Sequence, residues 1–208
     1  MAVGLECDVL VIGTGGAGCR AALTARKDGA EVIQMAKGPI GRCELTVMTM
    51  PGFGALMPSN PKDSRENFFL DTIDGGAYLN DRNLVSTLVD GSGEAIHFLE
   101  GLGARFDRCS DGTFMYYSGV EHTKTETPRQ LGIDDCMGRA FYNVLSGEIA
   151  RSGVRLMEDV FDVSLLIEKG QVRGLFAFDI RRGEPMVIWA GAEILATGGV
   201  VGLYTVRT

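Results

Sequence analysis

Residues 8–23 read DVLVIGTGGAGCRAAL, and this stretch decides the fold. It opens with a short apolar run rich in β-branched residues, which is typical of a strand buried on both faces of a parallel sheet. The run ends in the pattern G-x-G-x-x-G over residues 13–18, and a helical pattern continues from there to Asp28. Residues 31–35 predict a second strand. Together they form a strand–helix–strand unit with the size of a βαβ crossover.

The spacing of the glycines has a physical reason. Gly13 makes the tight turn, Gly15 lets backbone N–H groups approach a pyrophosphate, and Gly18 lets the helix pack closely on the strand. The positive end of the helix then faces the phosphates. The fingerprint also expects an acidic residue about twenty positions later to hold a ribose. Ala36 and Lys37 stand there instead. A dinucleotide site is therefore predicted, with a nicotinamide-dependent enzyme as a weaker hypothesis and a glycine-rich turn without ligand as the plain alternative.

Composition places the 208 residues among ordinary globular proteins, because 45% are hydrophobic and 23% are charged. The net charge of −7 argues against nucleic acid as a partner. The five cysteines are odd in number and contain no C-x-x-C pair, and no histidines share a ligand spacing, so neither a disulfide framework nor a metal site is predicted. The N-terminus lacks a signal-peptide pattern and no apolar run is long enough for a membrane span. We expect a cytoplasmic protein, or one peripheral to a membrane through partner subunits.

The remaining sequence changes texture three times. A stretch rich in glycine and proline predicts a long functional loop, and helical periodicity follows. Short strands separated by turn residues are then predicted over 154–157, 160–167, 171–179 and 186–190. The expected bounds are 38–62 for this loop, 63–152 for a mainly helical insertion and 153–191 for a β-meander. A last buried strand over 192–197 leads into Ala196-Thr197-Gly198-Gly199, a second glycine turn.

At this point four segments, in this order, resemble one family: DVLVIGTGGAGCRAAL, DTIDGGAYLNDRNLV, GLGARFDR and ATGGVVGLYTVRT. They are similar to the flavoprotein subunits of succinate dehydrogenase and fumarate reductase, a family that includes L-aspartate oxidase. The resemblance implies an α/β fold, namely a Rossmann-like FAD-binding domain with a central parallel sheet, flanking helices and a small β-meander. It also implies that residues 1–208 are the N-terminal portion of such a domain, with the capping and helical domains of the family absent from the chain.

FAD is the cofactor that the resemblance implies. Family members with covalent FAD carry Ser-His-Thr-Val where this chain has Glu44-Leu45-Thr46-Val47, so FAD is expected to bind noncovalently. The usual Ala-Gln-Gly-Gly is replaced over residues 49–52, which leaves the surroundings of the flavin ring undetermined. The residues expected to contact FAD are Gly13, Gly15, Gly16, Ala17, Gly18, Ala36, Lys37, Arg42, Thr46, Gly52, Gly54, Phe161, Ala196, Thr197 and Gly198.

The implied activity is hydride transfer between FAD and a dicarboxylate such as succinate or fumarate, with an iron–sulfur electron-transfer subunit as the implied partner. The family's principal substrate-binding and proton-donating residues fall beyond Thr208, so no catalytic residue is assigned. Two alternatives stay open: a non-catalytic truncated FAD-binding domain or a subunit whose site a partner completes, and an L-aspartate oxidase-like enzyme.

Several polar residues have competing interpretations. His122 and Arg129 resemble a loop that orients a dicarboxylate in some members, although a solvated loop is the commoner explanation. His97 is expected on a helix surface or packed, and Cys43 is expected as a small buried filler rather than a reactive thiol. The aspartates at positions 71, 74 and 81 are expected at helix ends and turns. Apolar surfaces larger than those of ordinary monomers are also expected, with marginal stability as their consequence.

Overall fold

The structure is a computed structural model that describes residues 3–42, 44–49, 52–118, 127–134 and 136–199. The chain forms two compact units, one from Met1–Met48 with Leu145–Thr208 and one from Thr49–Val144. Helix α5 (Met137–Ser152) runs across the boundary between them. The other elements of the first unit are β1 (Val3–Ile12), α1 (Gly16–Lys27), β2 (Val32–Met35), α2 (Leu45–Met48), β6 (Arg155–Met157), β7 (Val160–Glu168), β8 (Gln171–Asp179) and β9 (Glu184–Leu195).

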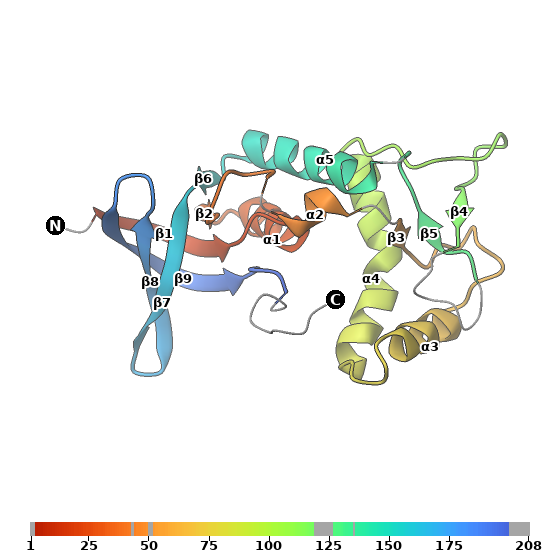
Figure 1. The fold of residues 1–208 in the computed structure, drawn as a ribbon, viewed down its shortest axis with the longest axis horizontal. Helices are drawn as coiled ribbons and strands as arrows, with labels where there is room; N and C mark the ends of the chain where they lie inside the picture. Colours follow the sequence, from red (N-terminus) through yellow and green to blue (C-terminus); the bar gives the residue numbers. More distant parts are fainter. Residues whose placement is uncertain (1–2, 43, 50–51, 119–126, 135, 200–208) are drawn as a thin grey trace. The chain divides into compact units, whose positions relative to one another are not determined.

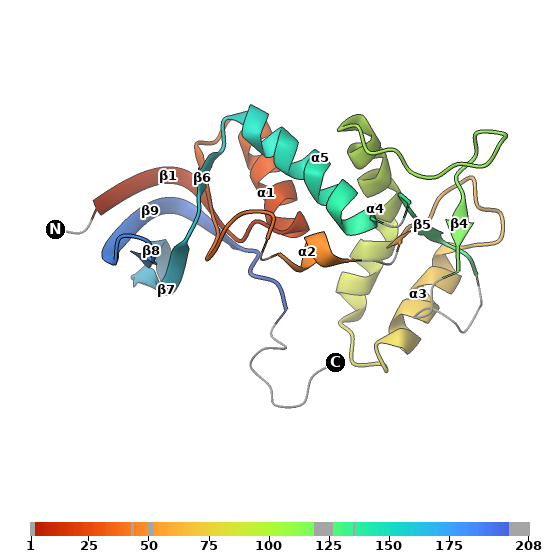
Figure 2. The same ribbon diagram turned by 45° about the horizontal axis from the view of Figure 1, so that its top comes forward.

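A six-stranded sheet in the order β6-β2-β1-β9-β8-β7 organises the first unit. Strands β6, β2, β1 and β9 are parallel to one another, whereas β9, β8 and β7 form an antiparallel meander. The first and last described strands of the chain are therefore neighbours, and Figures 1 and 2 show β1 (red) alongside β9 (blue). The register pairs Leu10 with Ile33 on one side and with Glu193 on the other. The predicted α/β class with a parallel central sheet and a meander is confirmed.

The apolar runs of the sequence explain this sheet. All four residues of β2 are buried, as expected for a strand covered on both faces. The meander and the parallel strands share one hydrophobic cluster, in which Leu10 and Ile33 meet Leu175 and Ile188. Helix α1 packs on β1 and β2 through its buried small residues, Gly18, Cys19 and Ala22.

The second unit contains a helical hairpin and a small antiparallel sheet in the order β3-β5-β4. Ser64 caps the first helix by accepting from Asn67 N–H, and Asp81 caps the second by accepting from Asn83 N–H. The predicted helix-end role of Asp81 is confirmed. The elements are β3 (Phe53–Gly54), α3 (Arg65–Gly75), α4 (Arg82–Gly101), β4 (Tyr116–Tyr117) and β5 (Gln130–Leu131). Their core cluster consists of Phe68, Ile73, Val85 and Val89.

One expectation about the strands is wrong. The runs over 186–190 and 192–197 belong to a single strand, β9, which covers Glu184–Leu195. Its first half pairs with β8 and its whole length follows β1, so two ladders hold it extended. Gly191 lies inside it because an added Cβ would stand 3.0 Å from the Asp8 carbonyl oxygen on β1. This glycine therefore marks a close approach of two backbones and not the end of a strand.

Candidate cofactor site

The two glycine turns of the sequence meet at one edge of the sheet. β1 and β9 are parallel and pair up to Ile12 and Leu195, so both chains leave the sheet side by side at their carboxyl ends. Ala196 N–H then donates to the Ile12 carbonyl at 2.8 Å. Ligands of open α/β sheets bind outside the carboxyl ends of the strands. The topology therefore brings Gly13 and Ala196 to the place where a dinucleotide is expected.

Gly13 fits this contact only because it lacks a side chain. Its φ is +117°, and an added Cβ would overlap the carbonyl group of Ala196. Its own N–H donates to the Met35 carbonyl at the end of β2, at 2.9 Å. The first glycine of the motif thus joins the ends of three neighbouring strands. Gly198, in the second turn, also has a positive φ of +82°.

The beginning of α1 has the features of an anion-binding helix terminus. The N-cap is Gly15, which makes no side-chain capping bond, and the first turn contains no acidic residue. An added Cβ at Gly18 would overlap the Gly13 carbonyl, so the third glycine permits the close helix–strand packing that the motif predicts. Gly16 and Ala17 form the first turn of the helix. Backbone N–H groups and the helix dipole both favour a phosphate here, so the turn fits a pyrophosphate.

Part of the loop predicted over residues 38–62 lies against this turn. Thr46, in α2, accepts a hydrogen bond from Gly16 N–H at 3.0 Å through its hydroxyl oxygen. Glu44 is buried and accepts a hydrogen bond from the Thr14 hydroxyl. Leu45 stands between them and is 78% exposed. Thr46 therefore adjoins the glycine turn. The side chain of Arg42 is exposed, and its backbone N–H donates to the Pro39 carbonyl at 3.2 Å.

The residues expected at the ribose and adenine also adjoin each other. Ala36 follows β2, donates to the Met157 carbonyl at 2.9 Å and accepts from Val160 N–H at 3.0 Å. Phe161 is the next residue along β7, and its side chain is half exposed. Lys37, which is exposed, comes directly after Ala36. Backbone bonds thus join the end of β2 to the start of the meander.

Gly52 and Gly54 lie in the second unit and are described there. An added Cβ at Gly52 would stand 2.8 Å from the Leu131 carbonyl oxygen of β5, and one at Gly54 would stand 3.5 Å from the Phe68 ring. Gly52 thus permits a close approach to β5, whereas a side chain at Gly54 would make an ordinary contact. The sequence predicted them as FAD contacts, which stays a prediction.

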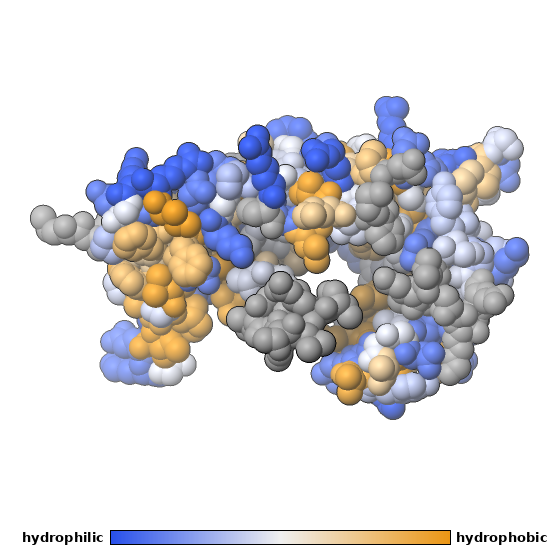
Figure 3. All heavy atoms as spheres, in the orientation of Figure 1, coloured by the Kyte–Doolittle hydropathy of each residue, from blue (hydrophilic) through white to orange (hydrophobic). Residues whose placement is uncertain are grey.

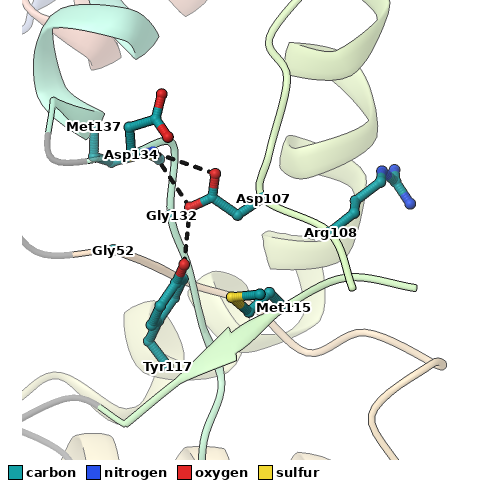
Figure 4. A pocket seen from close by; sticks show the side chains of 8 residues that line it. All are labelled: Gly52, Asp107, Arg108, Met115, Tyr117, Gly132, Asp134 and Met137. Carbon is teal, nitrogen blue, oxygen red and sulfur yellow. Dashed lines mark hydrogen bonds between the residues drawn. The ribbon is translucent and has the colours of Figure 1, made fainter. Parts of the chain in front are cut away.

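Gly52 also lines a cavity of about 570 Å³ in the second unit. Figure 4 shows Asp107 at its centre, where the carboxylate accepts from the Tyr117 hydroxyl at 3.0 Å and from Asp134 N–H at 3.2 and 3.3 Å. Met115 and Met137 supply apolar wall. Because both Asp107 oxygens accept hydrogen bonds from neighbouring chain segments, they hold the loops around the cavity together.

Arg129 does not occupy the position that the sequence suggested. Its side chain is 1% exposed and donates to both oxygens of Asp63, at 2.8 and 2.9 Å, and to Asp71 at 2.7 Å. Its guanidinium also lies 4.8 Å from the centre of the Phe68 ring. Because this guanidinium is buried and paired with two aspartates, Arg129 packs inside the second unit. This position fits neither a residue that orients a dicarboxylate nor one in a solvated loop. Asp71 is correspondingly part of a buried ion pair, and the expectation of a simple helix-end residue for it is wrong.

Four further residues received only an expectation or none. His97 is on the surface of α4, 3.4 Å from Glu100, as expected. His122 and Cys43 lie outside the described residues. Gln34 was not singled out by the sequence, yet it lies directly beneath the glycine turn and donates to the Gly13 carbonyl at 3.0 Å. A polar residue inside an otherwise apolar β2 was the signal that could have found it.

The sequence also matches known proteins. The family model for the FAD binding domain matches residues 8–207. The chain belongs to the FAD binding domain family. FAD is accordingly the cofactor that the family indicates. A fumarate reductase (CoM/CoB) subunit from Methanothermobacter marburgensis is 35% identical over 206 residues, which cover 98% of this chain and 37% of that protein.

Two further FAD-domain relatives extend the comparison. The 8-methylmenaquinol:fumarate reductase flavoprotein subunit of Wolinella succinogenes is 30% identical, over 98% of this chain and 33% of its own length. The structure of quinol fumarate reductase FrdA from E. coli superposes with a TM-score of 0.87 at 27% identity, covering 97% of this chain and 34% of that one. The resemblance inferred from the sequence is confirmed, and the chain spans about a third of the length of these relatives.

The described residues contain neither a candidate membrane span nor a candidate metal site. No helix among them is both long and apolar enough to cross a bilayer. Within the same residues, no three histidine, cysteine, aspartate or glutamate side chains gather in a way that could hold a metal ion.

Proposed function

We propose that this chain binds FAD noncovalently and is the FAD-binding part of an oxidoreductase of the fumarate reductase and succinate dehydrogenase type. Bound FAD would supply the hydride transfer, for which the protein provides position and electrostatics. One observation carries the proposal: Gly13 lies directly against Ala196, where two parallel strands end beside the N-terminus of α1.

Each part of the cofactor has candidate partners. The adenosine would lie toward Ala36, Lys37 and Phe161, which backbone bonds hold together. The ribityl chain and flavin would extend toward Thr46 and the second turn, which contains Ala196, Thr197 and Gly198. The contacts of Arg42, Gly52 and Gly54 remain predictions from the family resemblance. The pyrophosphate would lie at the first turn, against Gly13, Gly15, Gly16, Ala17 and Gly18.

The mode of attachment follows from Leu45. An aliphatic side chain has no atom that can form the bond to flavin that a histidine forms in covalent members of the family. Precipitating the FAD-loaded protein with acid should therefore leave all flavin in the supernatant. Flavin that stays with the precipitate would contradict noncovalent binding.

The substrate and the partner are proposed from the relatives. A dicarboxylate is the proposed substrate class and an iron–sulfur subunit is the proposed electron-transfer partner. The alternative is that the chain binds FAD without turnover. Succinate, fumarate with a reduced dye, and L-aspartate as the oxidase arm would each be tested with the FAD-loaded chain. Dye turnover by the chain alone would exclude the non-catalytic alternative.

A glycine pair in β1 and its turn provides a matched test of FAD binding. Gly15 has an ordinary φ, so Gly15→Ala adds a methyl group where the pyrophosphate is expected to approach, 3.3 Å from Thr46 Oγ1. Gly4→Ala adds the same group at a position with no atom within 4 Å. In a titration followed by flavin fluorescence, Gly15→Ala should weaken binding at least about tenfold, a change of about 1.4 kcal/mol. Gly4→Ala should bind like the wild type. Failure of the wild type to bind FAD, or equal affinity of all three proteins, would overturn the proposal.

A further inference from the structure

Gln34 is an unusual residue for its place in the fold. It lies in the middle of β2 with no exposed surface, on a strand whose other residues are all apolar. Its Nε2 donates to the Gly13 carbonyl at 3.0 Å and reaches the Cys19 sulfur at 3.8 Å. Its Oε1 is buried and has no hydrogen-bond partner among the described residues.

A buried amide with an unsatisfied oxygen destabilises the fold. Its cost arises because the amide oxygen gives up water on folding and gains no partner in exchange. Local rules of this kind are broken mostly at functional sites, where another gain offsets the loss. The contact that Gln34 makes is with the first glycine of the cofactor turn, so the gain should be sought there.

Peptide geometry shows what that contact does. In a trans peptide the C=O and the following N–H point in opposite directions. The Gly13 carbonyl faces inward to Gln34, so the N–H of Thr14 faces outward. The Thr14 carbonyl likewise accepts from the Cys19 thiol at 3.3 Å, which turns the N–H of Gly15 outward. Successive outward N–H groups form the type of nest that binds anions.

We propose that Gln34 is a positioning residue of the cofactor site, whose amide fixes the Gly13–Thr14 peptide so that the Thr14 N–H faces the FAD pyrophosphate. This inference rests on the proposed function, because it assigns a role toward FAD. Cys19 has the same role for the next peptide. Burial raises the pKa of the Cys19 thiol to about 11, against a smaller opposing effect of Gln34, so at neutral pH the thiol keeps the proton that it donates.

A substitution at Gln34 should change the affinity for FAD more than it changes stability. Gln34→Met keeps the volume of the side chain and removes both the donor and the unsatisfied oxygen. Removing the unsatisfied oxygen stabilises the FAD-free protein, whereas leaving the Gly13 carbonyl without its donor destabilises it, so the thermal midpoint should change little. The dissociation constant for FAD should increase about tenfold, the effect of one hydrogen bond. A side chain with only a packing role would not weaken FAD binding in a protein of unchanged stability. Gln171→Met, at the exposed start of β8, is the control and should change neither quantity.

Gln34→Glu provides the rescue. A buried carboxyl group favours its neutral form, and that form can donate an O–H to the Gly13 carbonyl, whereas the carboxylate cannot. The titratable groups near it are Cys19 and Glu44. Relative to the wild type at each pH, Gln34→Glu should bind FAD well at pH 5.5 and progressively worse toward pH 8.5. The ratio for Gln34→Met should not change over that range.

A measurement without FAD keeps this inference separate from the proposed function. In the free protein, the ¹H–¹⁵N resonance of Thr14 should shift in Gln34→Met and stay in place in Gln171→Met. If the wild type fails to bind FAD, the proposed function falls and the Thr14 resonance still decides whether Gln34 sets the turn. An unshifted Thr14 resonance, or a Gln34→Met protein that binds FAD within twofold of the wild type, would overturn the inference.

Discussion

Gly13 is the residue at which the two glycine turns meet. Its positive φ favours glycine, and the space of a Cβ is filled by the backbone of Ala196. Gly13→Ala should therefore destabilise the first unit by about 3 kcal/mol or more, through backbone strain and overpacking together. Urea unfolding followed by fluorescence reports on this unit, because the single tryptophan, Trp189, lies in β9. An unfolding curve like that of Gly4→Ala would contradict the close contact of the two turns.

Arg129 allows a matched comparison of a buried and an exposed ion pair. Its partners Asp63 and Asp71 are fully buried, and removal of the guanidinium strands two carboxylates. Arg129→Met should cost about 3–5 kcal/mol. Arg65→Met breaks a pair with Asp90 that is about half exposed and should cost much less, because water screens an exposed pair. Urea unfolding followed by far-ultraviolet circular dichroism measures both, and equal costs would show that the buried network is not needed.

Single residues were predictable from the sequence where the requirement is local. The roles of Gly13 and Gly18 follow from motif spacing, because a turn and a close helix contact impose themselves on neighbouring positions. Gln34 and Arg129 were not predictable in this way. The partner Asp71 is 58 residues away from Arg129 in the chain, so the pair exists only once the second unit has folded. Gln34 is likewise defined by the turn that packs on it.

Among the elements, β9 contains a residue that opposes its own burial. Both carboxylate oxygens of Glu193 are buried without a hydrogen-bond partner among the described residues, and burial raises the pKa of this carboxyl group. A raised pKa in the folded state means that stability is full below the unfolded value and is lost as pH rises through the folded pKa. Glu193→Leu should therefore stabilise the protein by about 1 kcal/mol or more at pH 7 and by little at pH 4.

Thermal unfolding at the two pH values measures the effect of Glu193→Leu. Glu184→Leu, at the exposed start of β9, is the control and should change the midpoint little at either pH. A Glu193→Leu protein that is less stable than the wild type at pH 7 would show that the carboxylate has a partner in solution.

Elements with a clear period were predictable, and one boundary was not. The predicted helix after the glycine turn corresponds to α1, and the predicted run over 171–179 corresponds to β8. The sequence around Gly191 looks like a break between strands because glycine weakens an isolated strand. In the fold, the backbone of β1 needs that glycine, which is information about a neighbour and not about the local sequence.

At the scale of the whole molecule, apolar surface is a prominent feature. Phe161, Phe178 and Trp189 are all at least about two fifths exposed, and Figure 3 shows hydrophobic side chains gathered over β7–β9. Contiguous apolar patches of this kind mark interaction surfaces. The FAD-free chain should therefore be modestly stable and should self-associate as its concentration rises, as sedimentation velocity would measure. A highly stable monomer at every concentration would contradict this expectation.

Both glycine turns should contact a single FAD molecule. Amide hydrogen exchange, measured with and without saturating FAD, tests it most directly because each turn is observed separately in one experiment. We expect amide exchange to slow in residues 13–18 and in residues 196–199 together, with the same dependence on FAD concentration. Protection of only one turn, or of neither, would contradict it.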